Sequence, residues 1–167
     1  SVWQISVGQP AWVSWLLYRA EPLGPQTDIT LLSPDGCWPQ VVNEAAIQAV
    51  LAQGVALAWF DRVGLAWDGP DAQRGGPVHQ HWPEVPWSAT AVWAWGMGYS
   101  ITALEQALQA PKIGVIGHSR GGKAAMAGGR YSPRRHPERP LGCGYYLPGM
   151  PDLWFPILTF IKVPLRG

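Results

Sequence analysis

The stretch Ile113–Lys123, which reads IGVIGHSRGGK, indicates both the fold and the chemistry of this chain. An apolar run typical of a buried strand, Lys112–Ile116, leads into it, and a small-residue segment that a helix tolerates follows it. Gly117–Gly121 is therefore G-x-S-x-G in the order strand, sharp turn, helix, which predicts a nucleophile elbow. Such a turn strains the backbone at Ser119 and presents its hydroxyl at the carboxyl edge of the sheet. The alternative is a tight turn whose serine only caps the helix.

Length and composition are those of one folded domain. A chain of 167 residues is long enough to bury a sizeable core. Apolar residues make up 47%, charged residues 14%, and the formal net charge is +1. This balance argues against a nucleic-acid partner, a strongly acidic partner and disorder. Eleven tryptophans suit an aromatic core and a sugar-facing surface equally, and of Trp93 and Trp95 at least one is expected in the core.

The sequence predicts no membrane partner and leaves the localisation open. No apolar run reaches the length of a membrane-spanning helix. Ser1–Pro10 lacks the basic and apolar regions of a signal peptide, and the chain does not begin with Met. Cys37 and Cys143 are expected to be free or buried thiols, because nothing else in the sequence indicates secretion. The oligomeric state is also open.

Predicted strands and helices alternate along the first two thirds of the chain. The strands are Val2–Val7, Trp12–Arg19, Ile29–Leu32, Val55–Phe60 and the elbow strand, and the first two form a hairpin-like pair. The helices are Glu44–Gln53, capped by Asn43 and ended by Gly54, and Trp87–Gln109; the stretch Asp61–Pro86 is irregular. This alternation predicts an α/β fold, with a mostly parallel sheet and helices on both faces.

The character of the sequence changes after Gly129. Arg130–Pro140 is rich in Arg and Pro, and Leu147–Pro164 scatters further prolines among apolar residues without a clear period. Ile157–Val163 is the first convincing strand candidate after the elbow. We therefore predict that residues 1–129 are the N-terminal part of the domain and that residues 130–167 form an irregular tail. Truncation of a longer protein or a shifted reading frame from about Gly129 would explain such a tail.

Three segments together resemble the glucuronoyl-esterase-like group of α/β-hydrolases, whose bacterial members are often described as acetylxylan-esterase-like. They are Val92–Gly96 (VWAWG), Ile101–Glu105 (ITALE) and the elbow stretch Ile113–Lys123. The similarity covers about Ile29–Gly129, and the elbow alone is also similar to that of chlorophyllases. The resemblance implies a three-layer αβα sandwich of α/β-hydrolase type, incomplete here at its C-terminal side. It also implies a carbohydrate-type ester substrate, small or polymeric and glucuronoyl or acetyl, without metal or cofactor.

The resemblance assigns roles to residues of the elbow. Ser119 would be the nucleophile that forms an acyl-enzyme. The backbone N–H of Arg120 would donate to the oxyanion, and its side chain would help to hold it. Lys123, one turn later, would contact hydroxyls of a sugar acid, and the loop Asp35–Trp38 would supply a second oxyanion donor. The plainer alternatives are that Arg120 pairs with a surface carboxylate and that Lys123 is solvated.

The catalytic base and acid are not identified by the sequence. In this fold the acid and then the histidine follow the nucleophile along the chain. After Ser119 the chain offers His136, Glu138 and Asp152, and His136 precedes Asp152, which is the wrong order. His118 is expected to pack beside the site. We therefore predict that this polypeptide alone is a poor catalyst, or a catalytically inactive hydrolase-like fragment or binding protein.

Three further kinds of function are compatible with parts of the sequence. The tryptophans would suit a noncatalytic carbohydrate-binding module, which requires an all-β fold. His79 and His81, with Asp68 or Asp71, would suit a zinc site if the H-x-H pair lay on a strand. The stretch from Gly117 to Lys123 has the spacing of a phosphate-binding P-loop, but Ala124 stands where Mg²⁺ needs a hydroxyl.

Overall fold

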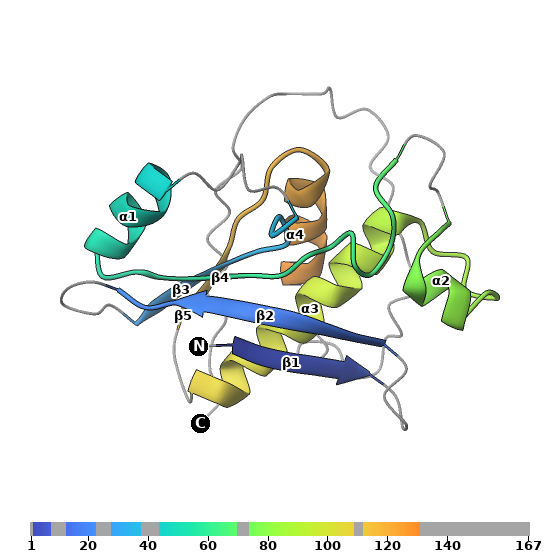
Figure 1. Ribbon diagram of the computed structural model, residues 1–167, viewed down its shortest axis with the longest axis horizontal. Helices are drawn as coiled ribbons and strands as arrows, with labels where there is room; N and C mark the ends of the chain where they lie inside the picture. The colour runs from blue at the N-terminus through green and yellow to red at the C-terminus, as the bar shows by residue number, and fades with distance from the viewer. Residues whose placement is uncertain are drawn as a thin grey trace.

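The computed structural model describes residues 2–7, 13–22, 28–37, 44–69, 74–108 and 112–130 (Figure 1). In chain order its elements are β1 (Val2–Val7), β2 (Val13–Ala20), β3 (Ile29–Ser33), α1 (Glu44–Ala52), β4 (Ala56–Trp59), α2 (Pro77–His81), α3 (Ala89–Leu108), β5 (Lys112–Val115) and α4 (Arg120–Arg130). The strands and helices predicted from the sequence within these ranges are confirmed, apart from small shifts at their ends.

The strands form one sheet in the order β1-β2-β4-β3-β5. β3 lies between β4 and β5 and runs parallel to both, while β2 is antiparallel to β1 and to β4. Among the described strands β2 alone therefore runs against the others, which confirms the mostly parallel sheet and the hairpin-like pair. Leu31 and Leu32 point to opposite faces of β3 and are both buried, so this central strand needs cover on each side.

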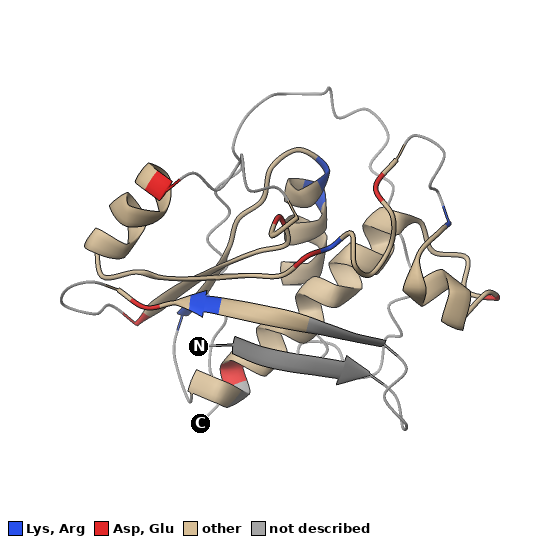
Figure 2. Cartoon of the chain, viewed as in Figure 1, with Lys and Arg blue, Asp and Glu red and all other residues tan. Residues whose placement is uncertain are grey.

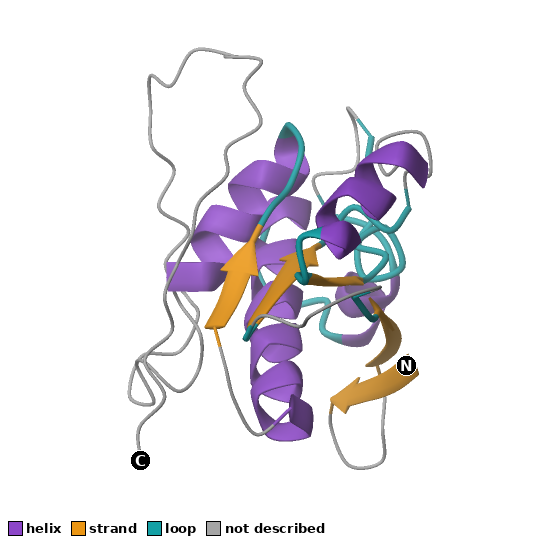
Figure 3. Ribbon diagram, turned by 90° about the vertical axis from the view of Figure 1, so that its left-hand side faces the viewer, coloured by secondary structure: helices purple, strands orange, loops and turns teal. Residues whose placement is uncertain are grey.

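Helices lie on both faces of the sheet. α3 and α4 pack against each other on one face, and α1 contacts β4 and lies across the sheet from them (Figure 3). α1 ends as predicted at Gly54, whose φ of 74° is a left-handed conformation that glycine adopts without steric cost. The described residues thus form a three-layer arrangement of helix, sheet and helix.

A core of apolar side chains fills the space between the sheet and the α3–α4 pair. Phe60, Trp93 and Met97 are among its largest buried members. Figure 2 shows α3 almost uncharged along its length, as expected of a helix that is covered on most sides. Trp95 is buried as well, which confirms that the tryptophan-rich segment contributes to the core.

One prediction is corrected, and others lie outside the described residues. The stretch after β4 is not wholly irregular, because α2 begins at Pro77, whose fixed φ favours the first position of a helix. The tail 131–167 with its strand candidate Ile157–Val163 is outside the described part of the chain, as are Asn43 and Cys143. Each helix in the described ranges falls short of the length and apolarity that crossing a membrane requires.

Gly128 tests the close approach of α3 and α4. A Cβ at this position would lie 2.5 Å from Met97 Cβ and 2.6 Å from the Ala94 carbonyl oxygen. We expect Gly128→Ala to lower the free energy of unfolding by about 1–2 kcal/mol, because overpacking outweighs the better helix propensity of alanine. Gly64→Ala is the control, since its Cβ would approach the Asp61 carbonyl oxygen no closer than 3.4 Å. Urea unfolding measures both, and equal stabilities would contradict the close helix contact.

Candidate active site

The predicted elbow is present between β5 and α4. Ser119 has a φ of 51°, the only positive φ of a non-glycine residue in the described ranges, and its side chain is exposed. A Cβ at Gly117 would lie 2.6 Å from the carbonyl carbon and oxygen of Gly121, so the backbone before the turn touches the helix after it. Strand and helix therefore meet too closely for larger residues, and this contact holds Ser119 in a strained conformation.

The first turn of α4 stands directly behind the serine. The N–H of Gly122 donates to the His118 carbonyl at 3.2 Å, and that of Lys123 donates to the Ser119 carbonyl at 3.2 Å. Arg120 is the first residue of α4. The first amides of a helix find no carbonyl within it and are available to a negative charge. Lys123 is exposed one turn further along, as a residue near the mouth of a site and a solvated helix residue both would be.

Three loops meet at the carboxyl edge of the sheet, where the elbow lies. The Phe60 N–H donates to the Ser33 carbonyl at 3.1 Å, and the Arg62 N–H to the Pro34 carbonyl at 3.2 Å, so the chain after β4 stays beside the chain after β3. On the other side of β3, the Ile116 N–H donates to the Leu32 carbonyl at 2.9 Å. These bonds bring charged residues of the first two loops next to the serine turn.

Asp35 connects all three loops. Its buried carboxylate accepts a hydrogen bond from the His118 N–H at 2.6 Å and pairs with the buried guanidinium of Arg62. A Cβ at Gly121 would collide with the same carboxylate, so a larger residue there would have to displace the Asp35 side chain. Burial raises the pKa of Asp35 above its ordinary value of 3.8, although the His118 N–H and Arg62 both act to lower it.

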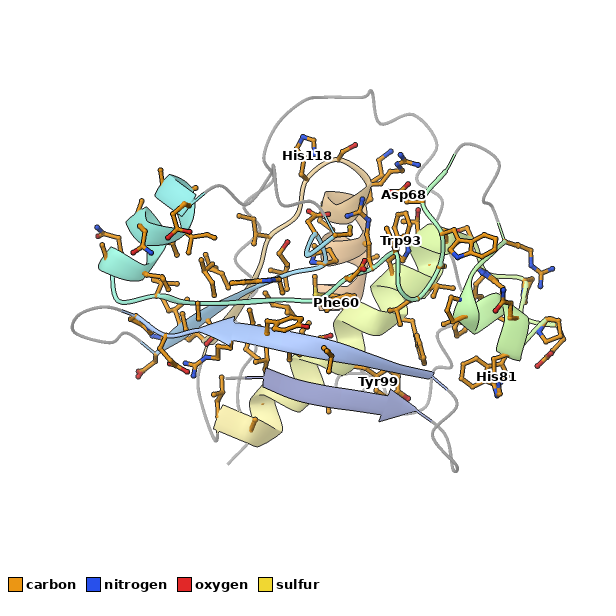
Figure 4. All side chains as sticks on the ribbon, in the orientation of Figure 1. Phe60, Asp68, His81, Trp93, Tyr99 and His118 are labelled. Carbon is orange, nitrogen blue, oxygen red and sulfur yellow. The ribbon has the colours of Figure 1, made fainter. Side chains whose placement is uncertain are left out.

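Asp68 extends this charged cluster to Arg120. Asp68 accepts a hydrogen bond from Arg62 Nη2 at 2.8 Å, and its other oxygen lies 2.5 Å from Arg120 Nη1. The Asp68 side chain is only 5% exposed whereas that of Arg120 is 49% exposed. Trp93 lies beneath the cluster, with its ring centroid 4.8 Å from the Arg62 guanidinium carbon (Figure 4). Arg120 thus pairs with a carboxylate, as the plainer alternative held, but with a buried one.

The loop after β3 fits its predicted role only in part. The Asp35 N–H donates to Ser33 Oγ at 3.2 Å, and the Gly36 N–H donates to the Phe60 carbonyl at 3.0 Å. Both amides are therefore engaged, and a second oxyanion donor from this loop would come from Cys37 or Trp38, of which Trp38 is outside the described residues. Cys37 carries a free thiol 3.5 Å from Arg62 Nη1, and burial raises the pKa of that thiol.

The zinc hypothesis is contradicted by the position of its histidines. His79 and His81 lie on the short helix α2 and not on a strand, so their side chains diverge. The ring nitrogens of His79 contact the Gly75 carbonyl at 3.0 Å and the Trp87 carbonyl at 2.8 Å. No three His, Cys, Asp or Glu side chains of the described ranges are grouped so that they could hold a metal ion.

The fold also contradicts a carbohydrate-binding module, and the residue at position 124 does not favour a P-loop. An all-β binding module is incompatible with α1, α3 and α4. Ala124, at the position where a P-loop needs its hydroxyl, is fully buried in the core. His136, Glu138 and Asp152 lie outside the described residues, so the base and the acid stay unassigned.

Sequence reasoning missed the charged cluster as a unit. Arg62 directly follows a buried strand in a chain with few charges. That position could have indicated a charged residue at the carboxyl edge of the sheet. Asp68 had no local signal, because it lies in an irregular stretch and one of its two partners, Arg120, is far along the chain.

Ser119→Gly tests the backbone strain at the elbow. A non-glycine residue with this φ carries about 1–2 kcal/mol of strain, which glycine removes and alanine keeps. We expect the glycine variant to gain about 1 kcal/mol in free energy of unfolding over the wild type, while Ser119→Ala gains nothing. Urea unfolding distinguishes them, and an equal gain in both variants would show that the backbone is relaxed.

Asp35→Asn tests the balance between burial and pairing at Asp35. Because the native pKa is raised, the folded protein binds this proton more tightly than the unfolded chain does. The resulting stabilisation is complete below the ordinary pKa of 3.8 and is lost as pH rises through the native pKa. We therefore expect the difference in free energy of unfolding, wild type minus variant, to fall as the pH rises above 3.8. Urea titrations at several pH values measure this difference. A rise would mean that the attraction of Arg62 outweighs burial.

The sequence of this chain is similar to those of known proteins. A family model described as glucuronyl esterase, fungi, matches residues 24–136, which is more than half of the chain. The 4-O-methyl-glucuronoyl methylesterase 1 of Wolfiporia cocos is 28% identical over 108 residues, which cover 61% of this chain and 26% of that protein. The chain thus spans about a quarter of the length of the curated relatives it matches.

Solved structures that superpose on this chain have the same fold. The glucuronoyl esterase catalytic domain from Hypocrea jecorina superposes with a TM-score of 0.57 at 24% identity, covering 80% of this chain and 36% of that one. A mutant glucuronoyl esterase from Sporotrichum thermophile, in complex with methyl 4-O-methyl-β-D-glucopyranuronate, superposes with a TM-score of 0.55 at 20% identity. The match covers 80% of this chain and 35% of that one. These matches confirm the predicted α/β-hydrolase fold, of which the described residues are a part. With its elbow at Ser119 and a family match over residues 24–136, the chain belongs to the glucuronyl esterase family.

Proposed function

We propose that the complete protein hydrolyses an ester of a sugar acid, with Ser119 as the nucleophile. The observation that carries the proposal is the exposed serine at a φ of 51° between β5 and α4, in a chain of the glucuronyl esterase family. The substrate class is supported by the curated relatives, which are 4-O-methyl-glucuronoyl methylesterases, and by the related structure that holds a methyl glucuronate ester. An acetyl ester, in which the sugar is the alcohol and not the acid, is the second candidate substrate.

The reaction follows from the position of the turn. Ser119 Oγ attacks the ester carbonyl carbon, the hydroxyl proton leaves to a base, and the carbonyl oxygen becomes an oxyanion. The Arg120 N–H at the start of α4 donates to that oxyanion, and the helix dipole favours its negative charge. The carbon–oxygen bond to the alcohol then breaks, the alcohol leaves with a proton, and water releases the acid from Ser119. Lys123 is placed one turn further to contact hydroxyls of the sugar acid.

The base is the missing part of this scheme. In α/β-hydrolases it follows the nucleophile in the chain, and residues 120–130 contain no His, Asp or Glu. The later candidates His136, Glu138 and Asp152 lie outside the described residues, and His136 precedes Asp152, which is the wrong order. We therefore assign the base and its orienting acid to a longer form of the protein. A site without them keeps at most a residual acceleration of about 10³–10⁴ over water, and only if the rest of the site is intact.

Labelling with a fluorophosphonate probe tests the proposal, because the probe reacts covalently with activated serines. We expect Ser119 to be labelled in a version extended to the full gene length and to be labelled poorly or not at all in the present chain. Ser119→Ala in the extended version is the control and should abolish labelling. Absence of labelling in both versions would contradict the esterase and would favour an inactive hydrolase-like or binding protein.

A further inference from the structure

Arg62 is a buried cation to which the proposed hydrolysis gives no role. Its side chain is only 4% exposed, and burying a charge is costly unless the charge is paired. The backbone of this residue is fixed on both sides. The Arg62 N–H donates to the Pro34 carbonyl at 3.2 Å, and the Arg62 carbonyl accepts from the N–H groups of Leu65 at 3.1 Å and Ala66 at 3.2 Å. The guanidinium therefore starts from a defined point at the carboxyl edge of the sheet.

The two ends of the guanidinium bind two different carboxylates. Nη1 of Arg62 donates to Asp35 Oδ1, and Nη2 donates to Asp68 Oδ2 at 2.8 Å. The guanidinium carbon lies 4.8 Å from the ring centroid of Trp93, whose indole N–H donates to the Ala66 carbonyl at 2.8 Å. A planar guanidinium packed on an aromatic ring keeps its donors in fixed directions. Arg62 therefore sets where the two carboxylates stand relative to each other.

Each of these carboxylates also binds a direct neighbour of Ser119. The Asp35 carboxylate accepts a hydrogen bond from the His118 N–H at 2.6 Å. Asp68 Oδ1 lies 2.5 Å from Arg120 Nη1. Figure 4 shows His118 and Asp68 at the same end of the molecule. One guanidinium is thus connected, through one carboxylate each, to the residue before the nucleophile and to the residue after it.

The guanidinium also keeps two negative charges together. Burial is the main cause that raises the pKa of Asp35, and the charge of Asp68 raises it further, whereas Arg62 lowers it. Two buried carboxylates this near repel each other unless a cation lies between them. Without the guanidinium they would move apart or one would take up a proton, and each would shift the elbow residue that it binds.

We propose that Arg62 is a positioning residue for Ser119, which holds both neighbours of the nucleophile in place through two carboxylates. The inference rests on the proposed function for the role of Ser119. Attack on an ester carbonyl depends steeply on alignment, and a misplacement of about 1 Å costs on the order of a hundredfold in rate. The rate of the chemical step should therefore depend on Arg62, and the binding of the ester should not.

Hydrogen exchange of backbone amides, followed by nitrogen–proton NMR, tests the positioning in the present chain without any catalysis. Arg62→Met keeps an apolar stem and removes the charge. We expect it to speed exchange of the His118 N–H by about tenfold or more, because the Asp35 acceptor loses the cation that holds it. The amides in the middle of α3 are the reference for global unfolding, and their exchange should change less.

Fluorophosphonate labelling of the extended version tests the consequence for the nucleophile. Labelling at several probe concentrations separates the maximal rate from the half-saturating concentration. We expect Arg62→Met to lower the maximal rate by about tenfold or more and to leave the half-saturating concentration within about twofold. Arg62→Lys should fall between, since an ammonium keeps the charge but cannot bind two carboxylates in fixed directions. It carries both tests if Arg62→Met does not fold.

Arg19→Met is the matched control. Arg19 is an arginine with a side chain 16% exposed, it pairs with Glu21, and β4 and β3 separate its strand β2 from β5. This variant should change neither the exchange of the His118 N–H nor the maximal labelling rate.

Three results would overturn the role of Arg62. They are exchange of the His118 N–H in Arg62→Met as slow as in the wild type, an equal acceleration of the α3 amides, and a maximal labelling rate equal to that of a labelled wild type. If the extended wild type is not labelled at all, the esterase fails. In that case faster exchange of the His118 N–H alone still supports the hold of Arg62 on the serine turn.

Discussion

The site depends on one buried carboxylate. The Asp35 carboxylate accepts a hydrogen bond from the His118 N–H of the elbow and forms an ion pair with the guanidinium of Arg62. It therefore connects the ends of β3, β4 and β5 at one point. Backbone hydrogen bonds hold these loops side by side, and the carboxylate adds a side-chain link among all three. The carboxylate lies so close to Gly121 that the start of α4 is fixed as well. A polar group in the interior thus contributes to the position of the serine turn.

Most of the fold could be predicted from local sequence, and the reasons are visible in particular elements. β3 and β5 are short apolar runs bounded by turn residues, and α1 ends at a glycine that adopts the expected left-handed conformation. Ser119 was predictable because G-x-S-x-G constrains the backbone through steric contacts within five residues. The ion pair of Asp68 with Arg120 was not, because the order of strands in the sheet brings the loop after β4 to the start of α4.

Two regions of α3 make different contacts: one packs in the apolar core, and the other lies against the charged cluster. Its middle packs against α4 and the sheet through side chains such as Met97, and Gly128 permits the close contact. Near its N-terminal end, Trp93 lies under Arg62 and donates its indole N–H to the Ala66 carbonyl at 2.8 Å. The same helix therefore supports both the core and the charged cluster. In a chain with only 14% charged residues, four of them gather at this one edge of the sheet.

Among the described residues, the partners Asp35 and Arg62 precede the serine turn in the chain, and this order matters during synthesis. Asp35 and Arg62 leave the ribosome well before α4 does, so their contacts with the turn can close as soon as that helix emerges. The serine turn can then be held in place while later residues are still being translated.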